Sequence, residues 1–152
     1  AWQQSRRYSF PLGVAIIDVD QFKQVNDKHG HPVGDQVLRE FAMLTLRVAR
    51  GTDVVARYGG DELVVLLPQA GPADAIAFGE RLLDAVHKHI FCESSVNLQM
   101  TASIGVACSV VGQPTETSSG LLARADEALY RAKNQGRDRV VGDGIREAPL
   151  HT

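Results

Sequence analysis

Two groups of carboxylates, Asp18 with Asp20 and Asp61 with Glu62, are the residues of this sequence best suited to metal chemistry. Hard oxygen ligands without nearby His or Cys favour Mg²⁺, which completes its shell with water and phosphate oxygens. Two such ions roughly 3.5–4 Å apart would activate an attacking hydroxyl and stabilise the leaving oxygen of a phosphoryl transfer. The alternative is that these acids are solvated residues at strand ends.

The first acids follow a predicted strand. The run Val14–Ile17 is apolar without alternation, as in a strand buried on both faces, and Asp18 lies at its carboxyl end. A short turn should lead from there to a helix over residues 31–50, where apolar residues recur at helical spacing.

The second pair of acids lies in a predicted hairpin. Two β-rich runs, residues 54–56 and 63–67, flank Gly59-Gly60, a dipeptide that suits a primed turn. Asp61 and Glu62 would then lie at the hairpin tip. If this hairpin neighbours the first strand, four carboxylates converge at one edge of the sheet.

The remaining elements set the fold class. Two more helices are predicted after Gly71-Pro72 and after the capping pair Ser118-Ser119, the last one ending at Gly136, and strands are predicted at residues 100–107 and 140–141. The order βαββαβ with a final αβ predicts an α/β (α+β) sandwich, with a central, mostly antiparallel sheet flanked by helices.

The size of the chain favours one domain. Its 152 residues, 44% of them hydrophobic, suit a single core. We expect residues 1–10 to be the end of an N-terminal linker or helix, residues 11–142 the domain, and residues 143–152 a tail. The chain begins without Met, which suggests a piece of a longer protein. No apolar run reaches the roughly 18 residues of a membrane span, so we expect no membrane contact.

The net charge and the cysteine content limit which binding partners and which cellular compartment are expected. The net charge of -2 provides no broad basic field for nucleic acid. Cys92 and Cys108 are too few for a disulfide framework, so we expect buried thiols in a reducing cytoplasm.

Several motifs together resemble the GGDEF family of diguanylate cyclases, in order and in spacing. They are the signature Arg57–Leu63 (RYGGDEL), Asp18–Lys23 (DVDQFK), Asn26-Asp27, Gly30-His31, Gly34-Asp35 and the stretch from Ala125 to Arg137, so that the match runs from Val14 to Val141. The resemblance implies a palm-like nucleotidyl-cyclase fold. It also implies condensation of two GTP molecules into cyclic di-GMP, with release of two pyrophosphates.

The resemblance implies roles for the acids. Asp18, the carbonyl of Val19 and Asp61 would ligate two Mg²⁺ ions, or Mn²⁺, in each active site. Glu62 would lie beside the 3′-hydroxyl as a metal ligand or proton acceptor. Asp20 is expected to be structural rather than a direct ligand.

The resemblance also implies a GTP site. Asn26 and Asp35 match the positions that bind guanine, which needs both an amide and a carboxylate. Lys133 and Arg137, four residues apart, would share one helical face. The remaining contacts implied with the nucleotide are Phe22, Lys23, Gly59 and Gly60, and the triphosphate would meet Lys23, Lys133 and Arg137.

Control of the reaction would lie between domains. Each domain of this family holds one GTP, so catalysis needs a homodimer, with a sensor domain expected N-terminal to it. Arg50 and Asp53 match the product-binding inhibitory motif, and Arg81 matches its secondary position. Two alternatives remain: a catalytically silent module that senses cyclic di-GMP or GTP, and a different nucleotidyl cyclase or polymerase-like palm.

Overall fold

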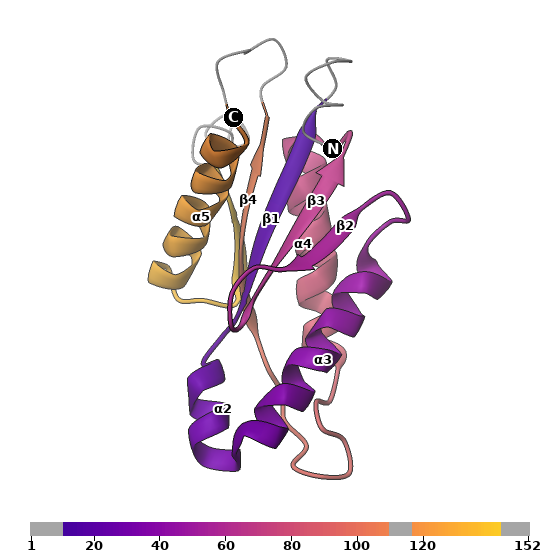
Figure 1. Ribbon diagram of the computed structural model, residues 1–152, viewed down its shortest axis with the longest axis vertical. Helices are drawn as coiled ribbons and strands as arrows, with labels where there is room; N and C mark the ends of the chain where they lie inside the picture. The colour runs from indigo at the N-terminus through magenta and orange to yellow at the C-terminus, as the bar shows by residue number, and fades with distance from the viewer. Residues whose placement is uncertain (1–10, 110–116, 144–152) are drawn as a thin grey trace.

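The computed structural model describes residues 11–109 and 117–143, which form a five-stranded sheet with helices against it (Figure 1). The strands are β1 (Leu12–Val19), β2 (Val54–Arg57), β3 (Glu62–Pro68), β4 (Ala102–Cys108) and β5 (Arg139–Gly142), in the spatial order β2-β3-β1-β4-β5. β1 pairs antiparallel with β3 and β4, and β5 alone runs parallel to its neighbour. The predicted mostly antiparallel sheet is confirmed.

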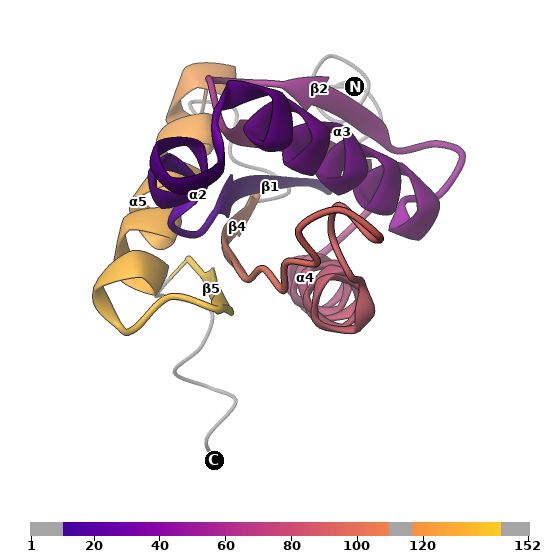
Figure 2. The same ribbon diagram turned by 90° about the horizontal axis from the view of Figure 1, so that it is seen from below.

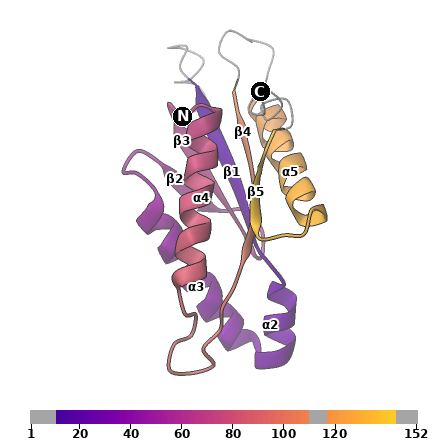
Figure 3. The same cartoon turned by 180° about the vertical axis from the view of Figure 1, so that it is seen from behind.

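The described residues also form the helices α2 (Phe22–His29), α3 (His31–Val48), α4 (Pro72–Lys88) and α5 (Ser118–Asn134). The alternating side chains of β1 divide the core. Ala15 and Ile17 pack with α3 and α4, whereas Val14 and Ile16 pack with α5. α4 and α5 therefore cover opposite faces, as the view from behind also shows (Figure 3).

Several elements meet at the carboxyl end of β1. α2 follows that end directly, and the β2–β3 loop and the last turn of α5 lie at the same end of the sheet (Figures 1 and 2). Every residue of β1 is buried, as expected for a central strand. The fold thus brings the ends of three separate stretches of chain together.

The predicted turn between β1 and α3 is wrong, because residues 22–29 form α2. Asn26 and Asp27 therefore lie in a helix rather than in a turn. Gln21 (φ 58°) precedes this helix, and Gly30 (φ 91°) separates it from α3. α2 is eight residues long with one buried residue, Val25, so it lacks the apolar stripe that would indicate it.

The β2–β3 hairpin is confirmed, but its turn is not of the primed type. Such turns need positive φ, and among the described residues the glycines with positive φ are Gly30 and Gly136. The longer loop closes when the Tyr58 N–H donates to the Glu62 carbonyl at 2.9 Å. Arg57 Nη2 donates to the Gly60 carbonyl at 2.7 Å.

The ends of α5 refine the predicted caps. The N-cap is Thr117, whose Oγ1 accepts from the Gly120 N–H at 3.0 Å, so Ser118 is the first helical residue instead of the cap. At the other end Gly136 (φ 118°) ends the helix as predicted. The Arg137 N–H donates to the Ala132 carbonyl at 2.9 Å, as in a Schellman motif.

Cys92 and Cys108 are both buried and form no disulfide. Within residues 11–109 and 117–143, no helix has the length and apolarity needed to cross a membrane. The expected linker at residues 1–10 and most of the expected tail at residues 143–152 lie outside the described residues.

Candidate functional site

The carboxylates of the two motifs meet at one edge of the sheet. Asp18 and Glu62 face each other in the β1–β3 register. The Val19 N–H donates to the Asp61 carbonyl at 3.3 Å, so the loop that precedes β3 is tied to the end of β1. The expected convergence of acids from distant parts of the chain is therefore what the backbone pairing produces.

Asp18 is held in an environment that disfavours its charge. The residue is 7% exposed. Burial raises the pKa of Asp18 to about 6, the Lys133 hydrogen bond opposes this rise, and nearby Asp61 adds to it. Burial also raises the pKa of Glu62, against the opposing charge of Lys133. The edge therefore favours a cation.

Lys133 supplies one positive charge at this edge. Its Nζ forms an ion pair with Asp18 Oδ2. Burial would lower the pKa of Lys133, but the contact with Asp18 and the charges of Glu62 and Asp61 outweigh burial, and the pKa rises. Lys133 is therefore protonated beside the acids.

The oxygen Asp18 Oδ1 is buried and has no hydrogen-bond partner. A buried carboxylate oxygen without a partner is costly unless a cation or donor completes it. No three His, Cys, Asp or Glu side chains among the described residues are grouped as a metal site. Mg²⁺ often relies on one or two carboxylates plus substrate phosphates and water, so Asp18 and Asp61 fit that pattern.

Asp20 does not join this group. Its oxygens accept from Thr101 Oγ1 and Ser103 Oγ, both at 2.6 Å, and from the Asp138 N–H at 3.0 Å. Asp20 is 4% exposed. These hydrogen bonds occupy both of its carboxylate oxygens.

The predicted placement of Arg137 on the same helical face as Lys133 is wrong. α5 ends at Asn134, so Lys133 and Arg137 do not share a helical face. Arg137 instead lies in the loop before β5, with Nη1 at 3.9 Å from Asp20 Oδ1. Both cations nevertheless lie near the end of β1.

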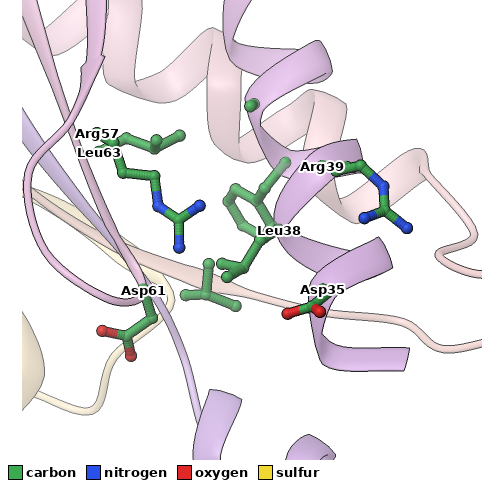
Figure 4. Close-up of a pocket in the computed structure, with 9 residues that line it drawn as sticks. Asp35, Leu38, Arg39, Arg57, Asp61 and Leu63 are labelled. Atoms are coloured by element: carbon green, nitrogen blue, oxygen red, sulfur yellow. The ribbon is translucent and has the colours of Figure 1, made fainter. Parts of the chain in front are cut away.

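A cavity of about 210 Å³ opens between α3 and the β2–β3 hairpin (Figure 4). Asp35 lines it from α3 and Asp61 from the hairpin. The guanidinium of Arg57 points into the space between them, whereas that of Arg39 points away (Figure 4). The apolar side chains Leu38 and Leu63 complete a slot suited to a flat, hydrogen-bonding ligand.

Asn26 does not line this cavity. Its Oδ1 is buried and has no hydrogen-bond partner. Gly34 makes room for it, because a Cβ at Gly34 would lie 1.8 Å from Asn26 Oδ1 and 3.2 Å from Phe22 Cζ. The Asn26 amide is therefore packed between α2 and α3, against Gly34, the residue that precedes Asp35.

The remaining predicted nucleotide contacts are on the surface. Lys23 is exposed on α2, and Gly59 and Gly60 are exposed in the hairpin loop. A Cβ at Gly60 would meet nothing within 4 Å, so the fold itself does not require glycine there. Open backbone at this loop leaves room for a ligand.

Arg50 and Asp53 form a compact pair at the end of α3. The Arg50 N–H donates to Asp53 Oδ2 at 2.8 Å, and Arg50 Nη2 lies 3.0 Å from Asp53 Oδ1. The Asp53 side chain is 0% exposed, whereas that of Arg50 is 49% exposed. Arg81 lies separately, on the exposed side of α4. The structure brings together two of the three predicted residues.

Sequence reasoning missed Arg57 as a cavity residue and Asp138 as a partner of Asp20. Arg57 could have been found, since it ends β2 two residues before Gly59. Asp138 gives no local signal, because its contacts are with Asp20 and His87, which are distant in the sequence.

Comparison with known proteins agrees with these motifs. The family described as "Diguanylate cyclase, GGDEF domain" matches residues 1–139. The response regulator PleD of Caulobacter vibrioides is 39% identical over 132 residues, which are 87% of this chain and 29% of PleD. The chain thus spans less than a third of this curated relative.

Solved structures share the fold. The active GGEEF domain of a diguanylate cyclase from Vibrio cholerae has a TM-score of 0.86 at 30% identity, covering 93% of this chain and 88% of that one. The GGDEF domain of DgcB from Caulobacter crescentus, in complex with c-di-GMP, has a TM-score of 0.86 at 32% identity, covering 94% and 84%.

Proposed function

The chain belongs to the GGDEF-domain family of diguanylate cyclases, and from that premise we propose that it condenses two GTP molecules into cyclic di-GMP. Each 3′-oxygen would attack the α-phosphorus of the other GTP. Two phosphodiester bonds form, two bonds to pyrophosphate break, and each 3′-hydroxyl proton passes to a base. The observation that carries the proposal is the meeting of Asp18, Glu62 and Lys133 at one edge of the sheet.

We place two Mg²⁺ ions, or Mn²⁺, at this edge. The ligands would be the side chains of Asp18, Asp61 and Glu62 and the carbonyl of Val19. The buried, unpartnered Asp18 Oδ1 supports this assignment. When bound, the ions would activate the 3′-hydroxyl and stabilise the departing pyrophosphate oxygen.

Glu62 is the proposed proton acceptor beside the 3′-hydroxyl. Burial raises the pKa of its carboxyl above the ordinary value, with Lys133 opposing and Asp61 and Asp126 adding to the rise. A carboxylate beside Mg²⁺ would stay ionised, so Glu62 could either accept the proton or ligate the metal. Asp18 and Asp61 would then serve as the fixed acids of the centre.

Guanine would bind between α2, α3 and the hairpin. Asp35 lines the cavity and would accept from guanine N1 and N2, while the Asn26 amide would bond the other edge of the base. Phe22 packs beside Gly34 at this point and would limit the depth of the pocket.

The triphosphate would meet cations from three elements. Lys23 lies on α2, Lys133 on α5 and Arg137 after α5. Gly59 and Gly60 would let the hairpin backbone approach the phosphates. These three positive side chains would offset part of the roughly four negative charges of GTP, although the chain as a whole is slightly acidic.

A homodimer would complete the reaction, because each domain supplies one GTP and half of the site. Product would bind at Arg50 and Asp53 and at Arg81 of an adjacent domain, where arginine forks match guanine O6 and N7. The c-di-GMP complex of the DgcB domain supports product binding in this fold. Encounter of two domains would be the controlled step.

In its parent protein the domain would be cytoplasmic, with an N-terminal sensor or regulatory domain and no contact with nucleic acid or membrane. Relatives such as PleD are much longer than this chain, which supports a regulatory partner.

Mass analysis of the products from GTP and Mg²⁺, with the chain fused to a dimerising segment, tests the function. We expect cyclic di-GMP and pyrophosphate, and Asp61→Ala should abolish both while leaving the circular dichroism spectrum unchanged. An intact dimer that binds cyclic di-GMP but forms none would favour the silent sensing module instead.

The product site has its own test. Arg50→Ala should remove inhibition by added cyclic di-GMP while initial rates persist. Unchanged inhibition would refute the assignment of Arg50 and Asp53. Arg81→Ala should weaken inhibition less, because it supplies only the secondary contact.

A further inference from the structure

The loop that carries Arg137 has an unusual backbone. Gly136, Arg137 and Asp138 have φ values of 118°, 64° and 49°, three successive positive values. Residues other than glycine rarely adopt this region, and two in a row need support from their surroundings. The contacts of this loop should therefore show what holds it.

Three contacts secure the loop from different sides. The Asp138 N–H donates to Asp20 Oδ2 at 3.0 Å. Asp138 Oδ1 lies 2.6 Å from His87 Nε2 at the end of α4. Arg139 Nε donates to the Arg137 carbonyl at 2.9 Å. Of these, the contact with Asp20 is the one that ties the loop to the end of β1.

Asp20 directly follows β1, and its N–H donates to the Thr101 carbonyl at 3.0 Å. Thr101 and Ser103 fix its carboxylate through hydrogen bonds of 2.6 Å each. The carboxylate thus faces the loop in a set orientation, with Arg137 Nη1 3.9 Å from Oδ1. Its hydrogen-bonded oxygens make it a poor metal ligand and a good anchor.

We propose that Asp20 is a positioning residue for Arg137. By accepting the Asp138 N–H, it would hold residues 136–138 in the left-handed conformation that keeps Arg137 beside the end of β1. The inference rests on the proposed function, in which Arg137 contacts the triphosphate of GTP. Asp20 itself would touch neither metal nor substrate.

The test compares Asp20→Ala and Asp20→Asn in the full 152-residue chain, using binding of a fluorescent GTP analogue with Mg²⁺. The alanine removes every contact, and affinity should fall roughly tenfold or more, as for loss of a hydrogen bond to a charged group. The asparagine can still accept from Asp138 and donate to Ser103, so it should restore most of the affinity. Asp84→Ala, which breaks only the exposed ion pair with Lys88, is the matched control.

A double-mutant cycle decides whether Asp20 acts through Arg137. Adding Asp20→Ala to Arg137→Ala should cause little further loss, because the positioned group is already absent. Independent, multiplicative losses would overturn the proposal. Equal losses in Asp20→Asn and Asp20→Ala, together with a raised Mg²⁺ requirement, would also overturn it and make Asp20 a metal ligand.

A second variant guards against misfolding. If Asp20→Ala melts early, Asp138→Val tests the same loop from its exposed side, because a β-branched residue disfavours positive φ. It should lower analogue affinity, and undiminished affinity would count against the proposal. Binding of the analogue does not require turnover. A wild-type chain that binds GTP but forms no cyclic di-GMP would therefore refute the proposed function, while the comparison of analogue affinities among the Asp20 variants would still test the positioning role.

Discussion

Asp18 and Glu62 lie opposite each other in the antiparallel register of β1 and β3. Facing residues of such a pair have Cβ atoms roughly 4.5–5.5 Å apart. Burial raises the pKa of both acids, the charge of Asp61 adds to each rise, and Lys133 opposes it. The fold therefore holds at this edge a charge arrangement that costs stability, which a cation would relieve.

Asp18→Asn should stabilise the metal-free protein at neutral pH. Burial raises the pKa of Asp18 from 3.8 to about 6, so the folded state binds the proton more tightly than the unfolded state. The ionised carboxylate thus destabilises the fold above pH 6, and this penalty disappears as pH falls toward 3.8. Urea unfolding in EDTA should show a gain on the order of 1–2 kcal/mol at pH 7.

The gain should shrink at pH 4.5, where Asp18 of the wild type is mostly protonated. Asp84→Asn, which removes only the exposed ion pair with Lys88, is the matched control and should change stability little. A less stable Asp18→Asn at pH 7 would mean that the Lys133 ion pair outweighs the cost of burial.

Mg²⁺ should reverse this order of stability. With a GTP analogue that cannot react, Mg²⁺ should raise the melting temperature of the wild type, because a ligand that binds only the folded state stabilises it. Asp18→Asn should gain much less, since it lacks the proposed ligand charge. EDTA should return both proteins to their metal-free values, and equal gains in the two would remove Asp18 from the metal site.

Glu40 should show the opposite pH dependence from Asp18. Burial would raise the pKa of Glu40, but hydrogen bonds from Gln36, His89 and the Cys92 N–H outweigh burial and lower it. The ionised group therefore stabilises the fold above pH 4.5, and this contribution is lost as pH falls through the lowered pKa. Glu40→Gln should lose about 1–2 kcal/mol at pH 7 and progressively less below pH 4.5.

Urea unfolding across this pH range measures the loss. Glu127→Gln, which removes only an exposed contact with Arg131, is a matched control and should be neutral. A constant deficit at every pH would assign the effect to packing rather than to charge.

The sequence predicted the elements that have strong apolar patterns. The stripe of α3 and the continuous run of β1 are set by burial, and both appear where expected. α2 was missed because Val25 is its one buried residue, and its place is fixed by its contacts with α3. Short helices that depend on tertiary packing leave little local pattern.

The sequence indicated which residues belong to the candidate site, but it did not always predict where the fold places them. Asp18 and the Asp61-Glu62 pair were expected to converge, and the β1–β3 register explains why they do. The position of Arg137 was misjudged, because helical spacing was extended past the end of α5 at Asn134. Asp138 could not be foreseen, since its role depends on a hydrogen bond to Asp20, which is 118 residues away.

Gly34→Ala should separate GTP binding from stability. A Cβ at this position would lie 1.8 Å from Asn26 Oδ1, so the Asn26 side chain must leave its place. Gly34 lies within α3, where alanine is intrinsically favoured over glycine by about 1 kcal/mol, which offsets part of the steric cost. We expect a small change in melting temperature but a loss of affinity for a GTP analogue of roughly tenfold, with little change for the matching ATP analogue, because Asn26 is proposed to recognise guanine. Asn26→Ala should lose the same discrimination and should not add to the effect of Gly34→Ala. If Gly34→Ala weakens both analogues equally, the disturbance has reached the phosphate contacts, and Asn26 is not the residue that distinguishes the bases.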